Sequence, residues 1–204
     1  MTKEEKLRKQ NYRKGIICIL LAAFFFACMN LFIRLAGDIN FVEKSFFRNL
    51  VATIFAFILL RKKKIKFDMK GEKLGVLARC FFGTMGVFCN FYAVDHLNIS
   101  DASLLNKLSP FFAIICSYFV LKETIKPYQL GCVILAFIGA VCVLKPFGEA
   151  IELFPALIGL SSGLFAGVAY TFLRKSTSRG VAGPVVVLAF SIFSCVAALP
   201  YSVV

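Results

Sequence analysis

The chain has 204 residues, of which 59% are hydrophobic, and a formal net charge of +13. A soluble domain of this length has too small a core to bury so much apolar surface, so the composition excludes an ordinary soluble protein. The charge does not indicate a nucleic-acid partner, because the basic residues gather in short segments that separate apolar stretches.

Seven apolar stretches follow one another along the chain, each close to the length of about 20 helical residues that crosses a bilayer core. They run over 15–36, 41–60, 74–94, 101–121, 128–144, 154–173 and 182–204. None alternates polar and apolar residues as a membrane barrel strand does, so each stretch predicts a spanning helix. The sequence therefore predicts an all-α polytopic membrane protein embedded in the lipid bilayer.

The basic residues indicate the orientation of these helices. Lys and Arg cluster in the N-terminal tail, 1–14, and in every second loop, near 61–73, 122–126 and 174–179. The alternate loops carry mainly acidic residues, so the positive-inside rule predicts a cytoplasmic N-terminus. The first apolar stretch is too long for a cleaved signal peptide and is interpreted as the first span. Since no organelle signal is visible, a bacterial plasma membrane is the expected location.

Residue types that carry catalysis or bind metals are arranged without a recognisable motif. The eight cysteines all lie inside apolar stretches, and the chain has one histidine, so no zinc-type spacing occurs. The G-x-S-x-G pattern at 159–163 lies within a predicted span, without the strand and triad that a hydrolase needs. We expect no catalytic residues, no metal and no cofactor, and hence a protein that is not an enzyme.

Cations inside the predicted spans are the main functional signal. An ionisable side chain costs about 2.5–3.5 kcal/mol at the centre of a membrane helix, so such residues usually face the bundle interior or a water-filled cavity. Arg48 lies about a third of the way into the second predicted helix, and Lys107 lies in the fourth. Lys107 shares a polar face with Asn106 and with Pro110, whose missing N–H favours a kink. If Arg48 and Lys107 face one cavity, they favour a solute with a carboxylate or phosphate.

Structural roles are alternatives for each of these cations. Arg48 could donate hydrogen bonds to backbone carbonyls, and Lys107 could pair with a carboxylate at an outer helix end, either Asp101 or Glu43. Arg34 and Arg79 lie near helix ends, where long basic side chains commonly extend toward the membrane surface.

Further residues are candidates for lining a cavity or for helix packing. The polar and aromatic candidates are Asn30, Asn49, Asn90, Tyr92 and Tyr170, the two tyrosines being able to stack on a planar or cationic solute. Close helix contacts are predicted at small residues, namely Gly83, Gly86, Gly163 and Gly167.

An internal repeat relates the first and sixth predicted helices. LLAAFFFACMNLFIR at 20–34 aligns with LSSGLFAGVAYTFLR at 160–174, and both segments end in an arginine. A repeat of this length holds five helices, an odd number, so the second copy enters the membrane from the opposite side. The predicted organisation is a basic tail, 1–14, a complete five-helix repeat, 15–144, and a partial inverted repeat, 154–204.

Five segments in order carry a family resemblance. They are LFIRLAG, SFFRNLVA, ARCFFGTMGVFCNFYAV, DASLLNKLSPFFAII and LKETIKPYQLGCVILAFIGAVCVL. Together they resemble the EamA-type branch of the drug/metabolite transporter superfamily. The resemblance implies ten helices in two inverted repeats around a central substrate cavity. It also implies a transporter that moves a small organic solute or metabolite by alternating access.

The end of the chain departs from that family pattern. The sequence stops at ALPYSVV, in or just after a seventh helix. We expect either a truncated member of the family or a homodimer that completes a cavity between two copies. The alternative is a truncated or auxiliary membrane protein without independent transport activity.

Overall fold

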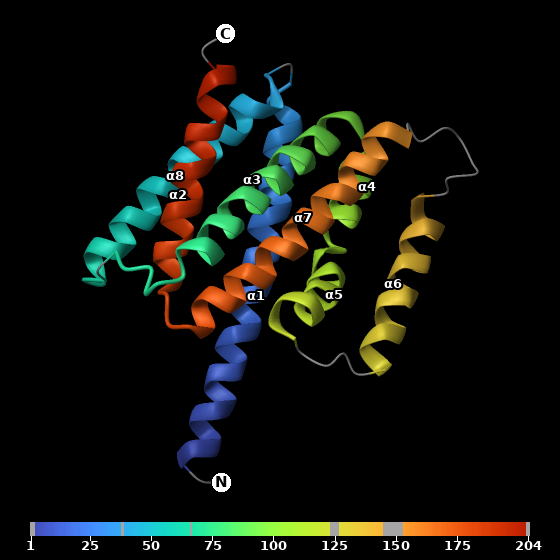
Figure 1. The fold of residues 1–204 in the computed structure, drawn as a ribbon. Coiled ribbons are helices and arrows are strands. Elements are labelled where there is room, and N and C mark those ends of the chain that lie inside the picture. The colour runs from blue at the N-terminus through green and yellow to red at the C-terminus, as the bar shows by residue number, and fades with distance from the viewer. Residues whose placement is uncertain (1–2, 38, 66, 123–126, 145–152, 203–204) are drawn as a thin grey trace. The chain divides into compact units, whose positions relative to one another are not determined.

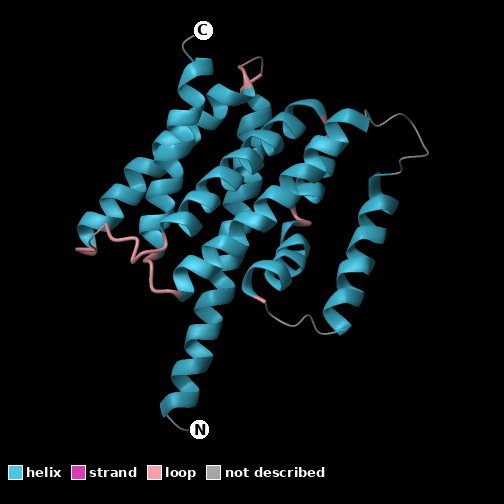
Figure 2. Ribbon diagram, viewed as in Figure 1, coloured by secondary structure: helices cyan, strands magenta, loops and turns pink. Residues whose placement is uncertain are grey.

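The computed structural model describes residues 3–202 apart from 38, 66, 123–126 and 145–152. Every regular element in these ranges is an α-helix, which confirms the predicted all-α class (Figure 2). The helices, labelled in Figure 1, are α1 (Lys3–Leu35), α2 (Phe41–Lys62), α3 (Lys73–His96), α4 (Ile99–Asn106), α5 (Ser109–Leu121), α6 (Pro127–Leu144), α7 (Leu153–Ser178) and α8 (Gly183–Ser202).

The predicted spans correspond to these helices. Five of the described segments are long and apolar enough to cross a membrane, namely Tyr12–Leu35, Lys73–His96, Ile99–Leu121, Leu153–Ser178 and Gly183–Pro200. α2 has 22 residues but carries charges at both ends and Arg48 inside, and α6 contains a shorter apolar segment, Pro127–Gly139. The described helices therefore confirm an integral membrane protein.

The fourth predicted helix is divided into α4 and α5. α4 ends where the Lys107 N–H donates to the Ser103 carbonyl at 3.0 Å, and α5 begins where the Phe112 N–H donates to the Leu108 carbonyl at 3.2 Å. Pro110 lies in the first turn of α5. Its ring has no N–H and excludes the carbonyl four residues earlier, so a continuous helical ladder cannot pass this point.

The chain forms two compact units, Met1–Gly37 and Asp38–Val204. The first unit consists mainly of α1, which runs from the basic segment into the apolar span without a break, so the predicted tail is helical from Lys3 onward. After α1 the chain turns at Gly37, whose φ of 62° lies in the left-handed region that glycine adopts readily.

Within the second unit, α3 packs along α7, α2 along α8, and α4 and α5 against α7 (Figure 1). Glycines lie at several of these contacts. Gly86 faces the backbone of α7, Gly163 faces the Leu105 carbonyl, and a Cβ on Gly167 would lie 2.6 Å from the Phe112 Cβ. The missing side chains allow these helices to approach closely, which is how many membrane helices pack.

One cluster of buried apolar side chains joins α2, α3 and α8. It consists of Ala56, Leu60, Val76, Cys80, Val181, Val185, Val186, Leu188 and Phe190. Lipid tails are as apolar as these side chains, so their contact is stabilised by van der Waals packing more than by exclusion of water. The cluster fixes the first half of α3 against α8 and thereby positions Phe190 beside α3.

Candidate functional site

Arg48 is held in place on α2 by its neighbour Asn49. The Arg48 Nη1 donates a hydrogen bond of 3.2 Å to the Asn49 Oδ1. The buried Asn49 Nδ2 donates to the Ser45 carbonyl at 2.9 Å and to the Ser194 hydroxyl of α8 at 2.8 Å. These two hydrogen bonds fix the orientation of the Asn49 amide, so that its Oδ1 accepts from the Arg48 guanidinium. Arg48 is thereby held at the contact between α2 and α8.

Arg79 lies on α3 against an aromatic ring. Its Cζ is 4.5 Å from the centroid of the Phe190 ring of α8, which is a cation–π contact. Gly83 makes room for this side chain, because a Cβ there would collide with the Arg79 Nη1 and lie 2.8 Å from the Phe190 Cε2. The Arg79 Nε is buried and has no hydrogen-bond partner among the described groups. The guanidinium is therefore directed at α8, which differs from the expected extension toward the membrane surface.

The two arginines meet neighbouring turns of α8. Arg79 contacts Phe190, and Asn49, which holds Arg48, bonds to Ser194, one turn after Phe190. Tyr170 of α7 lies within electrostatic range of both guanidiniums. No ion pair to a carboxylate is found for either arginine in the part of the chain that the structure describes. We call Arg48, Arg79 and Tyr170 the arginine cluster. It draws on three helices and has guanidinium N–H groups available for a ligand.

Lys107 lies in different surroundings from Arg48. Its exposed side chain lines a groove of about 590 Å³ between α4, α5 and α6, together with two serines of α4. The lining contains no residue of α2, and no described ion pair joins Lys107 to Asp101. Asn106 points elsewhere, because its Nδ2 donates a hydrogen bond of 3.2 Å to the Ser162 hydroxyl of α7. The structure thus does not bring Lys107 into the arginine cluster.

Asn90 is a buried amide on α3. It is 4% exposed, and its Oδ1 has no hydrogen-bond partner in the described ranges. It follows Gly86 by one turn, so it lies on the side of α3 that faces α7. A buried carbonyl oxygen without a donor is costly, so this group suits a ligand that donates a hydrogen bond.

Asn30 belongs to α1 and hence to the first compact unit, whereas the residues of the arginine cluster belong to the second.

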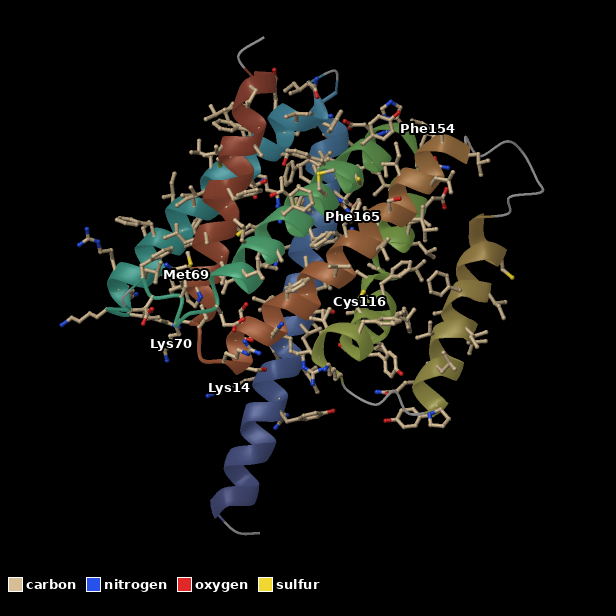
Figure 3. The ribbon with its side chains drawn as sticks, viewed as in Figure 1. Lys14, Met69, Lys70, Cys116, Phe154 and Phe165 are labelled. Atoms are coloured by element: carbon tan, nitrogen blue, oxygen red, sulfur yellow. The ribbon has the colours of Figure 1, made fainter. Side chains whose placement is uncertain are left out.

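Tyr92 belongs to an aromatic group where α3 approaches its end. Its ring stacks on His96 with centroids 4.0 Å apart, and meets Phe41 edge-on at 5.6 Å and Phe154 edge-on at 6.4 Å. Figure 3 labels Phe154 near the start of α7. At 1.5 Å per residue, Tyr92 is about 20 Å along α3 from Arg79. Tyr92 and Tyr170 are therefore placed in separate environments.

A buried ion pair between α2 and α3 was not predicted. The Lys44 Nζ lies 2.7 Å from the Asp95 Oδ1, and the two side chains are 5% and 18% exposed. The acidic residues of the loops indicated only the orientation of the helices, and no partner was predicted for Lys44. A usable signal was present, since Lys44 precedes Arg48 by one turn and shares its helix face.

Metal-ligand residues are dispersed in the described segments. No group of three or more His, Cys, Asp or Glu side chains there could hold a metal ion, and the eight cysteines are unpaired thiols. The groups that the fold does bring together are guanidiniums, a phenol and amides. Guanidinium N–H groups bind carboxylates and phosphates by charge-assisted hydrogen bonds, often two at a time.

Comparison with known proteins gives consistent matches to transporters. The model of the EamA-like transporter family matches residues 13–145. The pseudopaline exporter CntI of Pseudomonas aeruginosa is 30% identical over 168 residues, which cover 82% of this chain and 59% of the exporter. Human solute carrier family 35 member G1 is 26% identical, covering 80% of this chain and 46% of the carrier. A riboflavin transporter of Brucella anthropi is 26% identical, covering 79% and 57%.

The chain spans about half the length of the curated relatives it matches. No solved structure matches it. The family model accounts for well over half of the chain, and it includes Arg48, Arg79 and Lys107. The chain belongs to the EamA-like transporter family.

Proposed function

We propose that the protein is an integral membrane transporter that moves a small organic solute across the membrane. Membership of the EamA-like transporter family supports this, as do relatives that are named as an exporter of pseudopaline and a transporter of riboflavin. Within this molecule the proposal is carried by the arginine cluster. Charged side chains inside membrane helices are costly and characteristically mark the path of a solute or ion.

Alternating access is supported by the origin of the residues in the cluster. In the predicted organisation, α2 and α3 belong to the first repeat, 15–144, and α7 and α8 to the second, 154–204. Arg48 and Arg79 thus come from one repeat and Tyr170 from the other. In transporters built from inverted repeats, one repeat rocks against the other around a site at their interface. A solute bound at the arginine cluster would lie at such an interface.

The described contacts support a role in solute binding for some of the candidate residues more directly than for others. Arg48, Asn49, Asn90 and Tyr170 lie on α2, α3 and α7, helices that belong to one set of contacts. We propose them as contacts of the solute. Lys107, Asn106, Tyr92 and Asn30 stay predictions, since the described contacts place them with other neighbours or in the first unit.

We also propose that the N-terminus faces the cytoplasm of a bacterial cell. The basic segments near 61–73 and 174–179 then lie beside the anionic lipid heads of the inner leaflet. The ion pair between Glu72 and Arg179 would lie on the same side.

We further propose that the protein forms a homodimer. The mass of the reconstituted protein tests this.

Solute counterflow tests the transport proposal. The intact gene product is reconstituted into proteoliposomes that are preloaded with one unlabelled class of solute at a time, from amino acids, organic acids, nucleotides and organic cations. We expect one class to drive transient accumulation of its labelled member above the equilibrium level. Protein-free vesicles are the control for leakage.

Transport by the protein is contradicted if no class produces accumulation although the reconstituted protein elutes as a single folded species. That outcome favours the alternative of an auxiliary membrane protein. Mass photometry of the same preparation in nanodiscs supports the homodimer if the mass is twice that of one chain, and contradicts it if the mass is that of one chain.

A further inference from the structure

We propose that the arginine cluster binds the oxyanion group of the transported solute, so that the solute is a small organic carboxylate or phosphate. The inference rests on the proposed transport function and specifies the chemistry of its solute. It assigns Arg79 as a binding residue, and it replaces Lys107 by Arg79 as the partner of Arg48. Arg79, Phe190 and Gly83 carry the argument together with Arg48 and Tyr170.

The first step is the charge balance of the cluster. Arg79 meets α8 at Phe190, and Arg48 meets it through Asn49 at Ser194, one turn further on. Like charges this near in a membrane interior repel because the surroundings screen them poorly. Among the described residues, no carboxylate forms an ion pair with either guanidinium. An oxyanion placed between two arginines would neutralise charge that the described protein groups leave uncompensated.

The second step is the positioning of the two guanidiniums. Asn49 holds Arg48 through its Oδ1, while its own amide hydrogens are fixed by Ser45 and Ser194. The Arg79 Cζ lies over the ring of Phe190, and Gly83 leaves the space that the Arg79 Nη1 occupies. Groups held in this way lose little conformational entropy when a ligand binds, so their hydrogen bonds contribute more to affinity.

The third step is the number of available donors. A guanidinium has five N–H donors, and an aromatic ring below its plane leaves the donors at its edge free. In the described structure, Arg48 uses one donor on Asn49, and the Arg79 Nε has no partner. This arrangement suits the two or three oxygens of a carboxylate or phosphate.

A comparison within the chain separates this role from a structural one. Arg61 also lies over a phenylalanine, with its Cζ 5.3 Å from the Phe57 ring centroid, but it is exposed in the last turn of α2. That is the arrangement of a basic residue at a membrane surface. Arg79, by contrast, has a buried Nε and an electrostatic neighbour on α7. Arg61 therefore serves as a matched control for Arg79.

Ligand-induced thermal stabilisation tests the inference without a known solute. The intact gene product in nanodiscs is heated with a thiol-reactive dye that reports the cysteines exposed on unfolding. The probes are succinate, glutarate and inorganic phosphate, with succinamide as the neutral counterpart of succinate. We expect at least one oxyanion to raise Tm in a saturable manner, because a ligand that binds the folded state stabilises it. Succinamide should leave Tm unchanged.

Variants then connect the effect with the cluster. Arg79→Gln and Arg48→Gln are each expected to raise the half-saturating concentration about tenfold or more, as for a lost charge-assisted hydrogen bond. Gly83→Ala keeps both charges but displaces the Arg79 guanidinium, and it should weaken binding in the same direction. Arg79→Lys should restore only part of the affinity, since a lysine lacks the paired donors. Arg61→Gln should bind as the wild type does.

The outcomes distinguish this inference from the proposed function. Stabilisation by carboxylates alone or by phosphate alone identifies the oxyanion. Equal stabilisation by succinamide, or unchanged binding in Arg79→Gln, Arg48→Gln and Gly83→Ala, contradicts the assignment of the cluster. Counterflow of a neutral solute in a protein that no oxyanion stabilises overturns the inference and leaves the transport proposal intact. Oxyanion binding that depends on Arg79, in a protein without counterflow of any solute, supports the site and overturns transport.

Discussion

Asn49 of α2 and Ser194 of α8 are joined by a hydrogen bond of 2.8 Å, and neither residue is exposed. The same amide also holds Arg48. The contact therefore links the second helix of the predicted first repeat to the second helix of the predicted second repeat. This hydrogen bond joins two largely apolar helices, and polar contacts of this kind contribute to helix association in lipid.

Replacing Asn49 by Ala is expected to destabilise the protein by about 1–2 kcal/mol, because the Ser194 hydroxyl loses a donor and Arg48 loses its acceptor. Reversible unfolding in mixed micelles measures this change. Ser161→Ala is the control, since the Ser161 hydroxyl donates to the Leu157 carbonyl of its own helix, at 2.9 Å, and not to a second helix among the described residues. Equal stability losses in both variants would contradict a specific role of the contact between α2 and α8.

Gly167→Ala is expected to destabilise the packing of α5 on α7. A Cβ at this position would lie 2.6 Å from the Phe112 Cβ and 2.8 Å from the Ser109 carbonyl oxygen, and both neighbours belong to the backbone or are attached to it directly. Overpacking of this kind costs about 1–3 kcal/mol. The change is measured as a decrease in Tm.

Gly131→Ala provides the matched control for this prediction. Gly131 lies on α6 with nothing within 4 Å of the added Cβ, so the intrinsic helix preference of alanine should stabilise the protein slightly or leave it unchanged. A Tm for Gly167→Ala at or above that of Gly131→Ala would contradict the prediction that α5 and α7 pack closely at Gly167.

The helices were largely predictable from the sequence, because the length of an apolar stretch reports the thickness of the bilayer. Pro110 also gave a local reason for an interruption, and the chain divides there into α4 and α5. The break itself falls at Lys107 and Leu108, before the proline, since the missing hydrogen bond and the steric clash act on the preceding turn.

The partners of the polar residues were not predictable in the same way. Helical periodicity tells which residues share a face, but it does not tell which other helix that face meets. Arg79 meets Phe190, and Lys44 meets Asp95, across large separations in sequence. A cavity shared by Lys107 and Arg48 was one hypothesis for Lys107, and the groove that Lys107 lines is formed with α6. Because the sequence alone does not show which helices are in contact, it could not identify Arg79 as the second arginine of the cluster.

The buried ion pair of Lys44 and Asp95 is expected to be thermodynamically coupled. Removing one partner of a buried pair costs about 3–5 kcal/mol, and the 18% exposure of Asp95 places the expected cost at the lower end of this range. The double variant Lys44→Met with Asp95→Leu should lose less stability than the sum of the single variants. A double-mutant cycle in mixed micelles measures a coupling energy of about 1–3 kcal/mol. Additive losses would contradict the pair.

The ion pair of Glu72 and Arg179 is expected to behave differently. It joins the residue before α3 to the segment after α7, and the Arg179 side chain is 58% exposed. Exposed pairs contribute about 0–1 kcal/mol, and salt screens them. Glu72→Gln and Arg179→Gln should therefore each lower Tm only slightly at low ionic strength and not measurably at high ionic strength.

Exchange of the two charges provides the control for this last pair. Glu72→Arg combined with Arg179→Glu restores an attraction between the same positions and should recover the low-salt Tm better than either single reversal does. Thermal unfolding of the wild type, the two single reversals and the double variant at two salt concentrations measures the recovery. A large loss in the single Gln variants that persists at high salt would indicate that Glu72 acts through packing near Gly75 and Ser176, where a Cβ on Gly75 would lie 2.9 Å from the Glu72 Oε2. Because the Glu72 side chain is only 12% exposed while that of Arg179 is 58% exposed, the salt dependence separates the two contributions.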